Sequence, residues 1–94
     1  MQITIRFPES SGPAGKLADA ELHFTEGPLA GLKLIGFGVW ERHGHTRIVR
    51  LPTRQYSVNG ERRSFALLRP AADRASTESL RQAILDAYDR EVAR

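Results

Sequence analysis

Arginine is the residue type in this 94-residue chain whose number and spacing could carry chemistry. It supplies twelve of the fourteen basic residues, and eight arginines lie within residues 41–74. Three carboxylates accompany them there, so this middle segment has a formal charge of +5, whereas residues 1–40 and 75–94 carry −1 each. A guanidinium binds phosphate through two parallel hydrogen bonds and stacks on bases. The eight arginines are Arg42, Arg47, Arg50, Arg54, Arg62, Arg63, Arg69 and Arg74.

This arginine-rich middle segment has two interpretations. The first is a surface for the phosphates and bases of nucleic acid, with the ring of Tyr56 available for stacking. The second is a set of ordinary solvated side chains whose abundance reflects a gene rich in G and C. We find neither a helix that would read base sequence nor an aromatic platform of the RNP type, so any nucleic-acid binding should have weak sequence preference.

The other chemically capable residues are too sparse for catalysis. His43 and His45 could present two imidazoles to a metal, but Glu41 is the only carboxylate nearby. Gly36 and Gly38 form a GxG fragment that lacks the third glycine of a nucleotide-binding loop. The six serines lack a nucleophile-elbow sequence, and the carboxylates form no acid–base pair. We therefore expect no enzyme activity, metal site, cofactor or small-molecule substrate.

Length and composition indicate one small domain spanning residues 1–94. A chain of this length buries about 60–65% of its unfolded surface, and dimerisation is a common way to bury more. Cysteine is absent, which suits a reducing compartment. There is no apolar run of the ~18 residues that a membrane span needs, and the first residues do not resemble a signal peptide. We expect a cytoplasmic protein that does not enter a membrane.

Strands must position most of these arginines, because apolar and polar residues alternate along much of the chain. We expect a loop rich in breakers at 8–15 and a polar connection at 53–60 that closes with a tight turn at Asn59-Gly60. The five predicted strands are 2–7, 16–25, 29–41, 46–51 and 62–69. A hairpin of the last two would gather Arg47, Arg50, Arg54, Arg62 and Arg63 around one end.

Residues 29–41 read as a central strand, because apolar residues occupy both alternating sets and so favour cover on both faces. Gly36 and Gly38 are candidates for a bulge, a sharp coil or a close approach by another backbone. After residue 75, an apolar stripe at helical spacing predicts an amphipathic helix, with Ser76 or Thr77 as its N-cap. The stripe consists of Leu80, Ala83, Ile84, Ala87, Tyr88 and Val92.

These elements define the expected fold. It is an α+β domain in which an antiparallel β-sheet of about five strands is followed by one C-terminal amphipathic α-helix. A single helix covers one face of a sheet, and the two-sided apolar strand needs a second cover. A second copy of the chain is the simplest candidate, so we expect a homodimer.

Five segments occur in an order that resembles a known protein family. An apolar strand over 17–24 precedes the long apolar strand, and residues 48–54 are similar to a strand closing on Met-Pro-Ser-Arg or Met-Pro-Ser-Lys. Residues 60–70 are similar to a Gly-Glu-…-Arg-Asp-Ile-Ala-His-Pro stretch, and the helix over 77–90 ends in a Tyr-x-Arg-like sequence. This order, which covers residues 2–90, resembles stage V sporulation protein G, the family of bacterial septation regulators.

The resemblance implies a small dimeric regulatory protein that binds DNA and RNA. The chain departs from the family pattern at Leu67 and Leu68, which resemble an insertion, and at Arg69, where the family has histidine. The leading hypothesis is a homodimeric nucleic-acid-binding regulator without catalysis, and the alternative is a protein-interaction or structural module of the same fold. The resemblance implies phosphate-facing roles for Arg50, Arg54, Arg62 and Arg63, with Arg74 and Arg81 near the helix start as secondary candidates.

Overall fold

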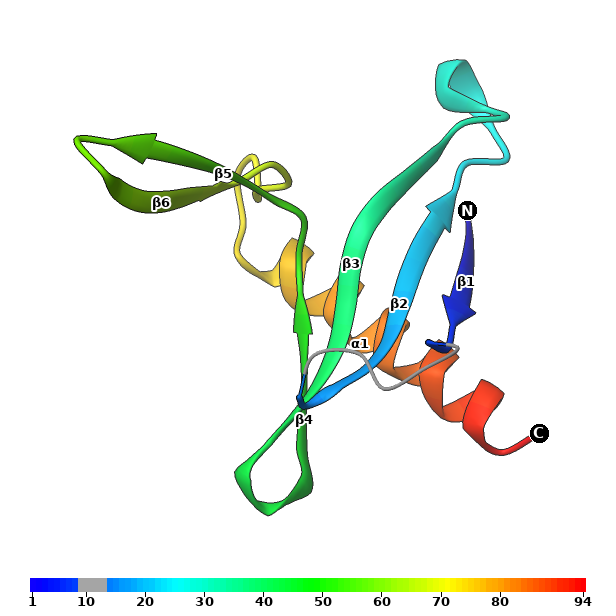
Figure 1. Cartoon of the computed structure of the whole chain (residues 1–94). Helices are drawn as coiled ribbons and strands as arrows, with labels where there is room; N and C mark the ends of the chain where they lie inside the picture. Colours follow the sequence, from blue (N-terminus) through cyan, green and yellow to red (C-terminus); the bar gives the residue numbers. More distant parts are fainter. Residues whose placement is uncertain (9–13) are drawn as a thin grey trace.

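The computed structural model describes residues 1–8 and 14–94, which form a sheet, a separate two-stranded arm and one long helix (Figure 1). The predicted loop at 8–15 falls mainly outside the described residues. The α+β class, the antiparallel sheet and the C-terminal helix are confirmed, and the described residues form six strands in two sheets. The first sheet has the order β1 (Gln2–Arg6), β2 (Lys16–His23), β3 (Lys33–Arg42) and β4 (Thr46–Arg50); the second pairs β5 (Thr53–Val58) with β6 (Glu61–Ala66). Short 3-10 helices span Gly27–Leu29 and His43–His45, and α1 spans Ala75–Val92.

The polar connection predicted at 53–60 is wrong, because residues 53–58 form strand β5. Strand β6 pairs with β5 and not with β4, so the predicted hairpin of 46–51 with 62–69 is also wrong. The reason lies in the turn: Asn59 and Gly60 both have positive φ, which is the geometry of a two-residue hairpin between directly consecutive strands. Pro52 separates β4 from β5, since proline cannot donate a hydrogen bond to a ladder.

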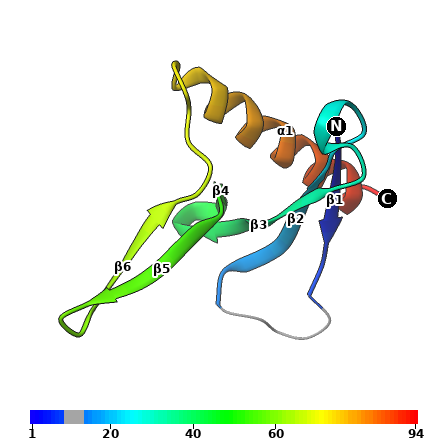
Figure 2. The same ribbon diagram turned by 90° about the horizontal axis from the view of Figure 1, so that it is seen from above.

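The hydrophobic core lies between α1 and one face of the four-stranded sheet (Figure 2). The helix stripe supplies Ile84 and Ala87, as its spacing predicts. Strand β3 lies between β2 and β4, as predicted for a central strand. The buried apolar residues of the strands are Ala18, Ala20 and Leu22 of β2, Phe37 and Val39 of β3, and Val49 of β4.

A bulge at Gly36 explains why both alternating sets of β3 are apolar. Ala20 pairs with Phe37 but Leu22 pairs with Leu34, so the register shifts between these two pairs. Gly36 has a φ of +103°, a conformation that favours glycine, and the bulge predicted for this strand is confirmed. Leu34 and Phe37 therefore pack on the same core although their numbers differ in parity. The double apolar pattern is thus mostly one buried face, and does not by itself require a second cover.

The start of α1 differs from the predicted cap. The helix begins at Ala75, whose N–H donates to the side-chain Oδ1 of Asp73 at 2.9 Å, while the Thr77 hydroxyl donates to the Arg74 carbonyl at 2.8 Å. The N-cap predicted at Ser76 or Thr77 is therefore wrong: the N-cap residue is Arg74, and the Asp73 carboxylate accepts a hydrogen bond from the first residue of the helix. Across residues 1–8 and 14–94, we find no helix that combines the length and apolar character required for crossing a bilayer.

Strands β5 and β6, with the turn between them, form an arm that projects from the sheet. In Figure 2, α1 lies on one side of the four-stranded sheet and the arm extends toward the other side. Every arm residue from 53 to 65 is exposed. The radius of gyration is 14.6 Å, whereas a compact domain of this length has about 12 Å. The arm thus gives the molecule surface that no part of its own core covers.

Candidate nucleic-acid interface

Strand register divides the arm into two faces with different chemistry, because alternate residues point to opposite sides and paired residues share a side. We call them the aromatic face and the polar face. The aromatic face carries Arg54, Tyr56, Val58, Glu61, Arg63 and Phe65; the polar face carries Thr53, Gln55, Ser57, Arg62, Ser64 and Ala66. The four arginines expected at phosphates are therefore divided: the arm holds Arg62 on one face and Arg54 and Arg63 on the other.

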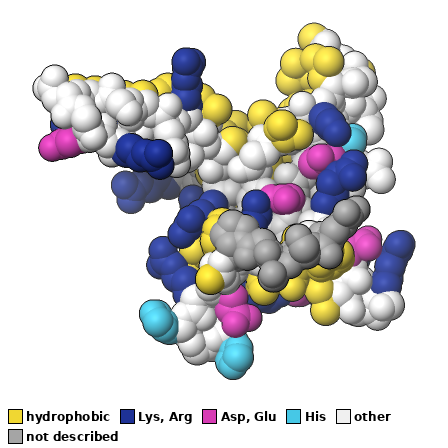
Figure 3. All heavy atoms as spheres, in the orientation of Figure 1, with side chains coloured by type: hydrophobic (Ala, Val, Ile, Leu, Met, Phe, Trp, Pro, Cys, Tyr) yellow, Lys and Arg dark blue, Asp and Glu magenta, His cyan; other side chains and the backbone are white. Residues whose placement is uncertain are grey.

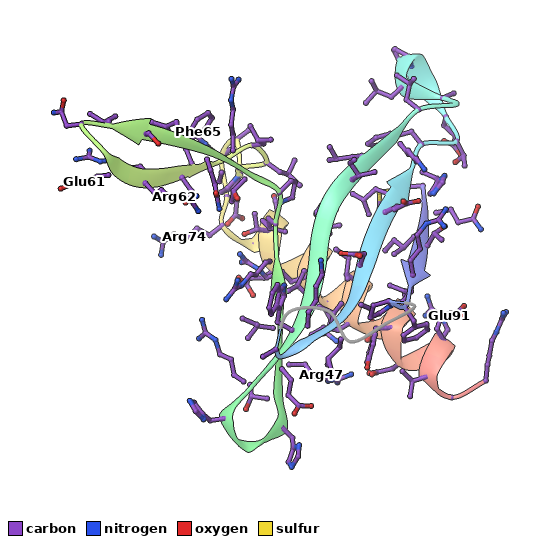
Figure 4. The ribbon with its side chains drawn as sticks, in the orientation of Figure 1. Arg47, Glu61, Arg62, Phe65, Arg74 and Glu91 are labelled. Carbon is purple, nitrogen blue, oxygen red and sulfur yellow. The ribbon has the colours of Figure 1, made fainter. Side chains whose placement is uncertain are left out.

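On the aromatic face, two rings lie side by side with cations around them. The ring centroids of Tyr56 and Phe65 are 5.7 Å apart, and the two side chains are 41% and 38% exposed. The Arg69 guanidinium lies 5.9 Å from the Phe65 ring centroid. Arg63 is 3.4 Å from the carboxylate of Glu61, which partly neutralises it. Each ring on this face lies directly opposite an arginine, Phe65 opposite Arg54 and Tyr56 opposite Arg63. Figure 4 shows Phe65 and Glu61 on β6.

On the face of the sheet away from α1, Trp40 lies among cations. The Arg50 guanidinium is 4.4 Å from the Trp40 ring centroid, and the Lys16 ammonium is 5.8 Å from it. Arg50 pairs in register with Gly38, so it projects on this open face beside the ring. Arg42 lines the same depression, and we call Lys16, Trp40, Arg42 and Arg50 the Trp40 cluster.

The Trp40 cluster is continuous with the polar face of the arm. Thr53 and Ala66, at the base of that face, line the same depression as Trp40 and Arg50. Arg62 lies farther out on the polar face and, with Arg74, is drawn in Figure 4. In Figure 3, Lys and Arg side chains gather beneath the arm and beside β4, in the left half of the view. A chain-like anion could therefore extend from the arm to the Trp40 cluster.

Of the secondary candidates, Arg74 directly precedes α1 and Arg81 lies inside its N-terminal half. Both line a shallow depression at the base of the arm, together with Arg69. Arg81 is already engaged, because it lies 2.9 Å from the Glu78 carboxylate and donates a 3.4 Å hydrogen bond to the Val49 carbonyl. Arg74 is exposed, so it is the more available of the two for an external anion.

Arg47, which the predicted hairpin grouped with the phosphate-facing arginines, has a structural role. It donates to Asp89 of α1, and its guanidinium lies 5.9 Å from the Tyr88 ring. The hydrogen bond to Asp89 raises the pKa of Arg47 above its ordinary value. Figure 4 shows Arg47 at the opposite end of β4 from the arm. Arg47 therefore links β4 to α1 and is not part of the candidate interface.

The most enclosed carboxylate on the open face is Glu21, which neutralises the cations around it. It lies 3.1 Å from Arg6, 3.2 Å from His23 and 3.4 Å from Lys33. Loss of solvent opposes its ionisation, but the hydrogen bonds from Arg6 and His23 and the nearby positive charges outweigh it, so the pKa of Glu21 is lowered. Free positive charge on the open face is therefore concentrated at the Trp40 cluster, away from β1.

The two histidines of the 43–45 turn do not assemble a metal site in the described residues. His45 Nδ1 lies 3.6 Å from Glu41, and both side chains are exposed. Among residues 1–8 and 14–94, no three histidine or carboxylate side chains come together in a way that could hold a metal ion.

Sequence reasoning missed Trp40 and underestimated Phe65. The signal for Phe65 was present, because a two-residue turn at Asn59-Gly60 sets the register that places Phe65 next to Tyr56 and opposite Arg54. The signal for Trp40 was Gly38, two residues before it in the same strand, which leaves room on the open face for a large ring.

The class that these features define is an α+β domain with a basic, partly aromatic open face and a projecting arm. Comparison with protein-family models, curated proteins and solved structures finds no match for this chain.

Proposed function

We propose that this protein is a non-catalytic, nucleic-acid-binding regulator that acts as a homodimer. The observation that carries the proposal is the continuity of the Trp40 cluster with the polar face of the arm. Arg42, Arg50 and Arg62 supply cations along this surface, and Trp40 supplies an aromatic ring. Guanidinium groups beside stackable rings are the combination that binds the backbone and bases of nucleic acid with little sequence preference.

Charge distribution supports the same proposal. The excess positive charge of the chain lies wholly within residues 41–74. Of the arginines in this segment, Arg47 points toward α1, where it pairs with Asp89. The stage V sporulation protein G resemblance, which covers the order of elements from residue 2 to 90, agrees with a binding role. Phosphate contacts made mainly by arginine predict an affinity that falls steeply with added salt.

Fluorescence anisotropy across a salt series tests this proposal. We expect labelled single- and double-stranded oligonucleotides to bind at about 50 mM salt and to lose affinity linearly on a log–log plot, with a slope near −0.7 per phosphate contact for single strands. Absence of binding to both oligonucleotides at that salt concentration would contradict the proposal.

Homodimerisation would cover the apolar surface that the chain leaves exposed. Ile35 is 60% exposed, Leu32 58% and Leu67 57%, and the aromatic face adds two rings. Within the described residues, β4 pairs with β3 from Gly38 to Arg42, which leaves the start of β3 an open edge. An isolated two-stranded hairpin is marginal in water, and an open edge accepts another strand. If the arm of a second copy lies along this edge, the arm gains a third strand to pair with and the open edge of β3 is covered.

Light scattering tests the dimer. At micromolar concentration we expect twice the 10.5 kDa chain mass, and Ile35→Asp should return the protein to a monomer because a charge at the contact would be buried without a partner. Thr25→Asp, which places the same charge at another position, is the control and should leave the dimer intact. A monomeric mass for the unsubstituted protein would contradict this part of the proposal.

A non-catalytic protein-interaction module is the second candidate. The exposed apolar side chains favour it, since exposed apolar patches commonly mark protein contacts. A stable dimer that fails to bind any oligonucleotide in the salt series would favour this alternative.

A further inference from the structure

The Trp40 side chain lies over Gly38 on the open face of the sheet, in a position that glycine makes possible. A Cβ atom added at Gly38 would come within 2.7 Å of the Trp40 Nε1 atom, so any larger residue there would displace the ring. The ring is half-buried in a depression of about 540 Å³, a volume within the usual range of ~300–1,000 Å³ for ligand sites. The sheet thus supports one side of an aromatic surface whose remainder reaches solvent.

Two cations border this ring, and one of them is free to move. Lys16 is 2.5 Å from Asp19, so its ammonium is already paired. Arg50 lies over the ring at 4.4 Å and, within residues 1–8 and 14–94, has no ion-pair partner. Moving the Arg50 guanidinium off the ring therefore breaks a cation–π contact but no salt bridge.

We propose that Trp40 stacks an unpaired base of a single-stranded nucleic acid, while Arg50 moves from the ring to a flanking phosphate. This inference rests on the proposed nucleic-acid function and names its ligand class and central residue. The base replaces the guanidinium over the ring, so the apolar surface stays covered. The guanidinium gains a doubly hydrogen-bonded phosphate partner in exchange.

A single strand is favoured over a duplex because only an unpaired base exposes its face to a side chain. Paired bases are stacked on both sides, and freeing one requires that its stacking and pairing be broken. The depression continues to Thr53 and Ala66 at the base of the arm, which gives the neighbouring nucleotides a path toward Arg62.

Trp40 is the only tryptophan in the chain, so its emission reports on this site alone. The intact protein is titrated with unlabelled twelve-nucleotide oligothymidylate and with a duplex of equal length. We expect saturable quenching by the single strand, with the same midpoint as the anisotropy titration, and no quenching by the duplex. Binding detected by anisotropy without a change in Trp40 emission would overturn the inference and leave the proposed function standing. Absence of binding in both measurements would overturn both.

Substitution provides a second test. Trp40→Leu keeps an apolar cover over Gly38 but removes the ring, and we expect it to weaken single-strand binding by about 5- to 150-fold. Trp40→Phe should retain most of the affinity because a ring remains. Phe7→Leu is the matched control, since Phe7 contacts Tyr88 on the helix side and should leave binding unchanged. If Trp40 only covers the sheet, the leucine variant will bind as tightly as the unsubstituted protein. Circular dichroism checks that each variant is folded.

Discussion

Replacing both Arg50 and Arg62 by alanine should weaken single-strand binding by about 25-fold at ~0.1 M salt. Each lost phosphate contact removes about 0.7 from the slope of log affinity against log salt, which corresponds to about fivefold at that concentration. The double variant should therefore also reduce the slope by about 1.4. Anisotropy titrations at four or more salt concentrations measure both quantities.

Two control variants distinguish the effect of where the arginines lie from the effect of net charge alone. Arg90→Ala with Arg94→Ala removes two charges at the far end of α1, where Figure 4 shows Glu91. Arg94 lies 3.8 Å from the Glu91 carboxylate. We expect this pair to change affinity by less than about twofold, because exposed charges beyond a Debye length are screened. Arg54→Ala with Arg63→Ala removes two charges from the aromatic face of the arm. Equal losses in all three double variants would mean that net charge governs binding, which would contradict the assigned surface.

Gly36→Ala should destabilise the fold through two effects that act together. At a φ of +103°, an alanine is strained by roughly 1–3 kcal/mol. Its Cβ would also lie 2.9 Å from the Pro52 Cβ, and Pro52 is a buried residue between β4 and the arm. We expect a total loss of at least about 2 kcal/mol, or a drop in Tm of roughly 8–16 °C.

Gly31→Ala is the matched control for this loss. Gly31 has a φ of +87°, but a Cβ there would meet no atom within 4 Å. Its substitution isolates the backbone strain from the contact with Pro52. Urea unfolding at one protein concentration compares the two variants, because a dimer would make the midpoint depend on concentration. If both variants unfold at the same urea concentration, the contact of the added Cβ with Pro52 does not contribute to the destabilisation.

Periodicity predicted the core better than it predicted the pairing of strands. The helix stripe and the alternation of β2 follow from local spacing, so Ile84, Ala87 and Ala20 are buried as their positions suggest. Strand β5 was missed because its polar side chains contact no core, and a fully exposed strand lacks the apolar alternation that marks a half-buried one. The Asn59-Gly60 turn was the better guide, since its geometry requires strands on both sides.

The candidate site was predicted only in part, for a related reason. An arginine count locates a basic region, but the face on which each side chain lies depends on register. Arg62 and Arg63 are adjacent in the chain and lie on opposite faces of the arm. The contact of Arg50 with Trp40 joins two strands and requires the pairing of β3 with β4, which no local pattern specifies.

The length of the arm can change without disturbing the core. Its two strands pair with each other and with no third strand in the described residues, so the rest of the fold does not depend on where the arm ends. Inserting two residues in each strand next to the turn would extend the tip by about 7 Å and keep every existing side chain on its own face. The length of the arm can therefore change in discrete steps of two residue pairs, and the core does not have to repack.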